Sequence, residues 1–304
     1  TQLKKMETLE INILTKSWNE LTRRQVLELW SNFYVARSFR DALPSAEAAQ
    51  CISIFQSIYN VSFETLAEWQ LSEWTDEEDA IDGAAGFYNG LQTLLDQSLA
   101  EIMTRNADTG QYQLLPKLTR SPWPEIAGAK NTVWFAPAIG WDNLSIYELA
   151  AVFTHQENYH SQDSLEDLYT MLAILYRPGK PATPENKMMA YGGDRRLPYR
   201  NYEGTVSSRA KLWKNMHPTV INILAFWALS CRQAIIDMYP RVFKAPGEAP
   251  QRERANDYSW GGVILSLAGG VANIDAVADQ NFHNCFTYLS MLEDERLERE
   301  MWGS

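Results

Sequence analysis

The stretch from residue 141 to residue 178 constrains the fold more than any other part of the chain, because it predicts two consecutive helices. Ser145 followed by Glu148 has the spacing of a capping box, in which the hydroxyl accepts from an early backbone N–H and the carboxylate reaches back to the N-cap. Apolar residues then recur at helical spacing: Ile146, Leu149, Ala150 and Phe153. The pattern fades beyond them, so we expect this helix to end near Tyr159.

A second helix is predicted directly after the first. Ser164 and Asp167 repeat the start signal, and Pro178 ends the pattern because the residue before a proline is pushed out of the α region. A short polar link between two such helices predicts an antiparallel pair. The apolar face of the second helix is too wide for a helix lying alone on a surface, and it consists of Leu165, Leu168, Tyr169, Leu172, Leu175 and Tyr176.

A third, longer helix follows in the C-terminal half. It begins at Pro218, a residue that suits the first helical turn, with His217 as its cap, and it ends near Tyr239. Gly269 and Gly270 then suit the left-handed end of a shorter helix. The second and third predicted helices both carry apolar residues over more than one stripe, so each must be covered on several sides. We therefore expect one buried core that contains Leu168, Leu172, Leu175, Leu224, Trp227 and Cys231.

Strand patterns are short and lie in the N-terminal half. Leu9, Ile11 and Ile13 alternate with polar residues, which predicts a half-buried strand, and residues 111–118 predict an extended segment. Helical patterns fill much of the rest, one of them opened by Thr22 and another over residues 46–59. The sequence therefore predicts a mainly α protein, a multi-helix globular bundle with a short β element near the N-terminus and another at residues 111–118.

An irregular connector rich in proline and glycine covers residues 116–140. Connectors of this length are uncommon inside compact domains. It either joins two domains or packs over a surface, tied down by Trp123 and Trp134. We place a boundary near residue 138, between a mainly helical N-terminal region with short strands (1–138) and a C-terminal helical domain (139–304), with one continuous domain as the alternative.

The net charge of −11 limits the classes of partner. Nucleic acid and anionic membrane surfaces both require basic faces, so neither is expected as a partner. The longest apolar run, residues 220–229, is too short to span a bilayer. Three widely spaced cysteines, Cys51, Cys231 and Cys285, suit reduced, buried thiols in a cytosolic protein better than a disulfide framework.

One group of residues partly matches a metal-binding motif. His155, Glu157 and His160 superficially resemble a zinc protease motif, but that motif places its histidines four residues apart with glutamate directly after the first. Histidines five apart do not share a helix face, so a polar helix end is the favoured interpretation. We assign no catalytic, cofactor-binding or metal-binding residue, and expect no cofactor.

A basic cluster stands out in this acidic chain, formed by Arg195, Arg196, Arg200 and Arg209. An internal salt-bridge or partner-docking role is the favoured interpretation, with an anion site as the minor alternative. The carboxylates Glu148, Glu166 and Asp167 are interpreted as helix caps and dipole partners.

The order of several motifs resembles a known group of proteins. The motifs are residues 17–22 after a strand, 142–145, 172–178, 260–270 and 288–290. Together they resemble proteins of phages and prophage-like elements of Bacteroidetes-type bacteria, of the tail-assembly chaperone-like or virion structural kind. The resemblance covers roughly residues 9–30 and 141–301 and rests on helix starts and stops.

The resemblance implies a non-enzymatic protein that binds other tail or virion proteins, tape-measure or tube-like ones among them, in the bacterial host cytoplasm or in the particle. A homo-oligomer is possible within that role. Two alternatives stay open: a metal-dependent hydrolase that uses His155, Glu157 and His160, and a bacterial peptide-binding adaptor with no phage connection.

Overall fold

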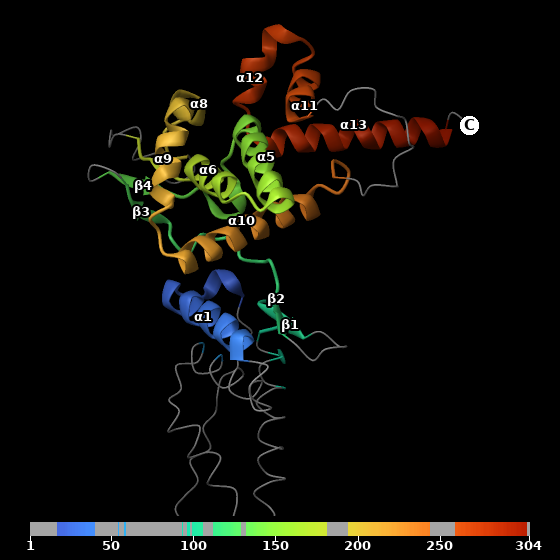
Figure 1. Ribbon diagram of the computed structural model, residues 1–304. Coiled ribbons are helices and arrows are strands. Elements are labelled where there is room, and N and C mark those ends of the chain that lie inside the picture. The colour runs from blue at the N-terminus through green and yellow to red at the C-terminus, as the bar shows by residue number, and fades with distance from the viewer. Residues whose placement is uncertain are drawn as a thin grey trace, which may run out of the picture. The chain divides into compact units, whose positions relative to one another are not determined.

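The computed structural model describes residues 17–39, 99–105, 112–128, 132–180, 194–243 and 259–302, with single helical positions at Ile54, Ile58, Thr93, Asp96 and Gln97. The protein is mainly α with two small sheets, as the sequence predicts (Figure 1). The chain divides into two compact units between Leu115 and Pro116. That division lies earlier than the expected boundary near residue 138.

The N-terminal unit contains the 3₁₀ helix η1 (Trp18–Glu20), the helix α1 (Arg23–Phe39) and an antiparallel pair of strands, β1 (Met103–Arg105) and β2 (Tyr112–Leu114). The strand β2 confirms part of the extended segment predicted at 111–118. The predicted strand at Leu9–Ile13 lies outside the described residues, as does the predicted helix at 46–59 apart from Ile54 and Ile58, which are helical and buried.

Local capping explains where α1 begins. The Thr22 N–H donates to Gln25 Oε1 at 2.9 Å and the Gln25 N–H donates to Thr22 Oγ1 at 3.3 Å, which confirms the capping box at this position. Trp18 is buried and its Nε1–H donates to the Leu115 carbonyl at 2.9 Å, so η1 is joined to the chain segment after β2.

The C-terminal unit contains most of the described helices. They are α5 (Ile146–Gln162), α6 (Leu165–Leu175), α8 (Tyr199–Tyr202), α9 (Val206–Trp213), α10 (Pro218–Met238), α11 (Ser259–Ala268), α12 (Ile274–Ala278) and α13 (Phe282–Trp302), with the 3₁₀ helices η3 (Ile139–Trp141), η4 (Glu203–Thr205) and η5 (Val271–Asn273). A three-stranded antiparallel sheet, in the order β3 (Glu125–Ala127), β4 (Val133–Phe135), β5 (Arg177–Pro178), belongs to the same unit.

The predicted helix pair is present as α5 and α6, which pack against each other (Figure 1). Ser145 and Ser164 cap them, accepting from the backbone N–H groups of Glu148 and Asp167. His155 bonds to Asp167 beside the link, whereas Glu148 bonds to Arg177 at the other end, so the helices run antiparallel.

The capping-box prediction at Ser145 is wrong in one respect. The Glu148 side chain does not return to the N-cap; it is buried and bonds to Arg177. Its interpretation as a cap is therefore corrected, because a buried carboxylate requires a charged partner, and Arg177 and Arg196 provide it.

All six residues of the predicted core are fully buried, Leu168, Leu172, Leu175, Leu224, Trp227 and Cys231. Aromatic rings join the helices around them. The Tyr176 ring, directly after α6, lies 5.1 Å from the Trp213 ring of α9 and 6.0 Å from the Trp227 ring of α10, both edge-on. Edge-on ring pairs add to the burial of apolar area, so Tyr176 helps to hold α9 and α10 at the end of α6.

Residues 116–128 and 132–138 of the connector pack on the C-terminal helices, which explains the earlier unit boundary. Trp123 and Trp134 are buried, as predicted, and β4 pairs with β5 directly after α6. The Tyr176 hydroxyl donates to the Trp123 carbonyl at 2.8 Å, and the Trp227 indole donates to the Thr119 carbonyl at 3.2 Å.

The helix α10 begins as predicted, with the His217 ring accepting from the Thr219 N–H at 3.3 Å. Its 21 residues exceed the apolar run seen in the sequence, and it is the one helix in the described part of the chain that alone is long and apolar enough to cross a membrane. Many of its apolar side chains, Trp227 and Cys231 among them, are buried within the unit, which suits a core helix, whereas Met238 at its end is 55% exposed.

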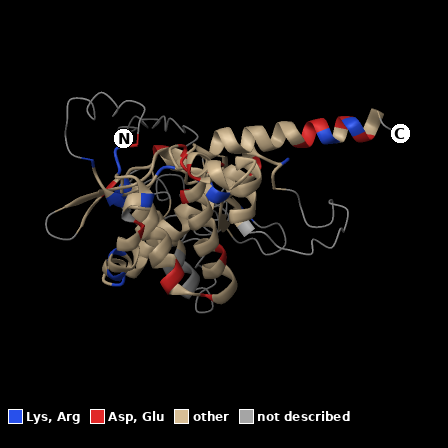
Figure 2. Cartoon of the chain, turned by 90° about the horizontal axis from the view of Figure 1, so that it is seen from above, with Lys and Arg blue, Asp and Glu red and all other residues tan. Residues whose placement is uncertain are grey.

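Gly269 ends α11, and α13 extends out of the unit. α11 ends at Ala268 before Gly269, whose φ of 62° is the left-handed conformation predicted there. α13 begins inside the unit with Phe282, Cys285 and Phe286 buried, and then extends beyond the other described helices of this unit (Figures 1 and 2).

Candidate functional site

The residues of the metal-site hypothesis do not converge. His155 Nδ1 lies 2.6 Å from Asp167 Oδ1, while Glu157 and His160 are exposed on α5. Among the described residues, no group of histidine, cysteine and carboxylate side chains is arranged to hold a metal ion. His155 thus takes part in the contact between α5 and α6, where Asn158 also donates to Asp167 at 3.3 Å.

A second histidine joins three elements. His283 Nδ1 lies 2.6 Å from the Tyr239 hydroxyl, and its Nε2 lies 3.2 Å from Asp142 Oδ1. The chain of contacts ties the end of α10 to the start of α13 and to the loop before α5. Asp142 is largely exposed and its backbone carbonyl also accepts from Asn281 at 2.6 Å, so the arrangement serves to position α13.

Two of the three cysteines are described, and both are free thiols inside the unit. Burial raises the pKa of Cys231, and nearby Asp142 raises it further. Burial also raises the pKa of Cys285. A thiol held in its protonated form is a poor nucleophile, so both cysteines pack as small apolar groups.

Among the residues that the structure describes, buried charge gathers at Glu148, Arg177 and Arg196 with the partly buried Asp194, and we call these four residues the charge cluster. Arg177, Arg196 and Glu148 are almost completely buried. Glu148 contacts both arginines, with 3.2 Å from its Oε2 to Arg177 Nη2 and 3.1 Å from its Oε1 to Arg196 Nη1. Asp194 bonds to Arg196 at 2.7 Å and to Arg177 at 3.3 Å.

Backbone carbonyls complete the charge cluster. Arg177 donates to the carbonyls of Leu197 and Ile174, and Arg196 donates to the carbonyl of Leu175 at 2.7 Å. Every guanidinium nitrogen of the two arginines therefore has an acceptor within the protein. Through these bonds the charge cluster connects the end of α6 to α5 and to the segment that precedes α8.

Burial affects the two arginines differently. It lowers the pKa of Arg177, because desolvation outweighs the attraction of Glu148. Burial acts in the same direction on Arg196, but Glu148 and Asp194 outweigh it and raise the pKa of that guanidinium. Both side chains remain charged at neutral pH, because arginine does not lose its proton in proteins.

A cavity of about 550 Å³ opens beside the charge cluster and is also lined by Lys180, Tyr199, Arg200 and Asn281. Lys180 Nζ donates to the Asp194 carbonyl at 2.6 Å, and Arg200 pairs with Asp275 and Asp279 on α12. The cations of the wall thus have acceptors within the protein, which leaves this cavity poorly suited to bind an anion.

Of the predicted basic cluster, Arg196 forms internal salt bridges, and the other arginines lie in different surroundings. Arg196 belongs to the charge cluster, Arg209 is buried and donates to the Ala173 carbonyl at 3.1 Å, and Arg195 pairs with Glu125 at 3.1 Å. Burial and the nearby Arg177 lower the pKa of Arg209 to about 10.

An exposed surface remains on the part of α13 that leaves the unit. Tyr288, Met291, Leu292 and Trp302 are 51%, 57%, 40% and 87% exposed. With Glu295 and Arg299 they occur at helical spacing on one side of α13, and we call these six residues the distal face. An apolar row of this kind on an otherwise charged helix is typical of a protein-binding surface.

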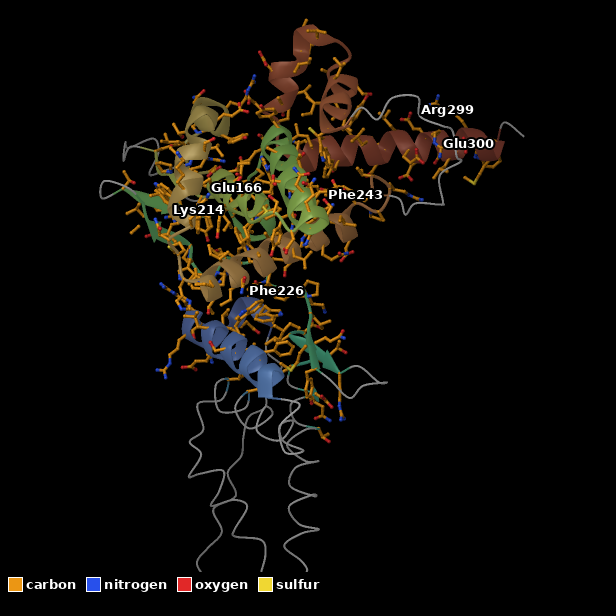
Figure 3. All side chains as sticks on the ribbon, in the orientation of Figure 1. Glu166, Lys214, Phe226, Phe243, Arg299 and Glu300 are labelled. Atoms are coloured by element: carbon orange, nitrogen blue, oxygen red, sulfur yellow. The ribbon has the colours of Figure 1, made fainter. Side chains whose placement is uncertain are left out.

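Charges of both signs follow one another along the distal half of α13 (Figure 2). Within the distal face, Arg299 Nη2 lies 3.3 Å from Glu295 Oε2, four residues earlier. Arg296, on another side, pairs with Glu293 and with Glu300. Figure 3 shows Arg299 and Glu300 near the C-terminal end of α13.

Sequence reasoning missed the residues that matter most for these two features. The pattern of residues 172–178 predicts a helix stop, yet its Arg177 is a buried ion-pair partner. A cation directly after six apolar residues was the available signal. The exposed Trp302 follows a charged stretch and carried no such signal, because the sequence does not show that α13 leaves the unit.

Comparison with protein families, with curated proteins and with solved structures finds no match for this chain.

Proposed function

We propose that this chain is a non-enzymatic protein of a phage or phage-like particle, a tail-assembly chaperone or a structural component, that acts by binding other protein chains. The resemblance of its helix starts and stops supplies the particle setting. The observation that carries the binding role is the distal face of α13, with four large apolar side chains at 40% exposure or more.

The physical reason is the free energy of burying such side chains. Aromatic residues bury about 150–250 Å² each and dominate the energetics of interfaces, tryptophan above all. Trp302 and Tyr288 lie on a helix that is anchored by buried Phe282 and Phe286, so a partner meets a surface that is already ordered. Preorganisation of this kind lowers the entropy lost on binding.

The charge cluster is consistent with the non-enzymatic part of the proposal. Its four side chains satisfy one another and backbone carbonyls, which is how a buried structural network is built. A hydrolase built on His155, Glu157 and His160 has no support in the geometry, because His155 is bonded to Asp167 and the three do not form a metal-binding group.

The test is co-expression of the full chain with the products of its neighbouring genes, followed by affinity capture. The expected result is recovery of a long helical tape-measure protein or a tube subunit. A Tyr288→Ala/Trp302→Ala variant should lose that recovery, and Leu212→Ala, which removes a 38% exposed leucine from α9, is the matched control. Recovery of this chain with no other particle protein would overturn the proposal.

The peptide-binding adaptor differs from this proposal only in its partner. It would use the same distal face, and the capture experiment separates the two: an adaptor recovers peptides or host proteins in place of tape-measure or tube proteins.

A further inference from the structure

Four residues of the distal face form a pattern that is symmetric about the level of residue 297. Leu292 and Trp302 lie five residues before and after that level, and Glu295 and Arg299 lie two residues before and after it. Each pair therefore combines two complementary side chains at equal distances from one point on the helix: one aliphatic with one aromatic, and one acidic with one basic.

We propose that the partner on the distal face is a second copy of this chain, bound antiparallel through a two-fold axis at the level of residue 297. This inference rests on the proposed function, because it names a second copy as the chain that occupies the same surface when no tape-measure or tube protein is bound there. In a two-fold pair the same patch faces itself, so each contact occurs twice.

The antiparallel arrangement makes the contacts complementary. Trp302 of each copy lies over Leu292 of the other, beside Met291, and Arg299 of each copy faces Glu295 of the other. The Glu295–Arg299 pair within each helix, at 3.3 Å, then becomes part of a four-charge arrangement across the pair. A parallel arrangement in register would set Glu295 against Glu295 and Arg299 against Arg299, and like charges across an interface oppose association.

The charge of the distal half disfavours a lipid surface as the occupant. Residues 293–300 carry five acidic side chains and two arginines. Helices that lie on membranes use lysine and arginine on the polar side to bind anionic lipids. The mixed, net acidic pattern here instead matches the oppositely charged positions that set partner and orientation between paired helices.

The extent of the surface predicts a weak, concentration-dependent dimer. With about 150–250 Å² for an aromatic side chain, Trp302 together with Leu292 and Met291 on each copy buries a total below about 1,000 Å². Specific interfaces begin at about 1,000–1,200 Å² in total. We expect dissociation in the micromolar range or weaker, so that a tape-measure or tube protein can replace the second copy on the distal face.

The experiment is sedimentation equilibrium of the full chain alone, at concentrations from micromolar to several hundred micromolar. Wild type should show a monomer–dimer equilibrium. Arg299→Glu places four carboxylates at the interface, and Glu295→Arg places four guanidinium groups there, so each should weaken the dimer about tenfold or more, which corresponds to 1.4 kcal/mol or more. The double exchange Glu295→Arg/Arg299→Glu restores complementarity and should restore dimerisation.

The matched control is Glu300→Arg, which reverses a charge on another side of the same helix and should leave the dimer unchanged. Circular dichroism establishes that each variant is folded. A wild-type chain that stays monomeric throughout, or a double exchange that fails to recover the dimer, overturns the second-copy inference. The capture experiment decides the proposed function separately, since a monomer that still recovers a tape-measure or tube protein keeps that function.

Discussion

Glu148 of α5 and Arg177 of β5 form a buried ion pair that joins the start of one helix to the segment following the next. The two residues are 3% and 1% exposed. Such a pair is costly to desolvate, and its main consequence appears when one partner is removed, because the other is left charged and buried. The pair therefore specifies how α5 and α6 meet more than it adds to net stability.

Arg177→Met should lower the free energy of unfolding by about 3–5 kcal/mol, the usual result of removing one partner of a buried ion pair. Glu148 keeps its contact with Arg196, but the carbonyls of Ile174 and Leu197 lose their donor. Urea unfolding followed by circular dichroism measures it. Arg299→Met, which removes a largely exposed arginine from α13, should cost within about 0.5 kcal/mol in the dilute monomer. Equal effects of the two substitutions would contradict the structural role of the charge cluster.

Leu172→Ala should destabilise the fold by about 2–5 kcal/mol, because Leu172 is fully buried and its truncation leaves a cavity. Leu165→Ala is the matched control on the same helix, since Leu165 is 52% exposed, and it should cost well under 1 kcal/mol. Chemical denaturation of both variants tests which face of α6 is buried. An unchanged free energy of unfolding in Leu172→Ala would contradict the assignment of Leu172 to the buried face.

Gly179→Ala should destabilise by about 1–3 kcal/mol, the range for forcing atoms into packed space. A Cβ at Gly179 would lie 2.5 Å from the Phe135 ring, against which the Arg195 guanidinium also stacks at 4.0 Å. Gly204→Ala is the control, because nothing lies within 4 Å of its Cβ position. Thermal unfolding should show a lower midpoint for the first variant and an unchanged or higher one for the second.

His160 predicts a dependence of stability on pH. Partial burial lowers its pKa below the ordinary 6.5, and the charge of Arg232 lowers it further. Because the unfolded chain then binds a proton at a higher pH than the folded chain, this residue stabilises the fold less as pH falls below about 6.5. At pH 8, His160→Ala should cost well under 1 kcal/mol, since the side chain is exposed.

Unfolding free energies of wild type and His160→Ala, measured between pH 8 and pH 5, test the direction in which the contribution of His160 to stability changes with pH. The difference between the two should shift in favour of the variant as the pH falls. A shift in favour of wild type would mean that His160 gains a proton more readily when folded.

Local sequence determined the helices and many of their ends. Ser145, Ser164, Thr22 and His217 cap helices where they are expected to, and Gly269 adopts the left-handed conformation predicted for it. These outcomes depend on side-chain-to-backbone bonds within a few residues and on backbone preferences, which a sequence displays directly. The buried core of α6 and α10 was equally predictable, because a wide apolar face needs cover on several sides.

Tertiary structure decided which side chains meet across long separations in sequence. Glu148 satisfies the requirement for a helix cap as well as for an ion pair, and only the approach of Arg177 and Arg196 selects the second role. Trp123 and Trp141 are buried, whereas Trp302 at the end of a charged helix is 87% exposed. Burial depends on which elements pack against a residue, and that is a property of the whole fold.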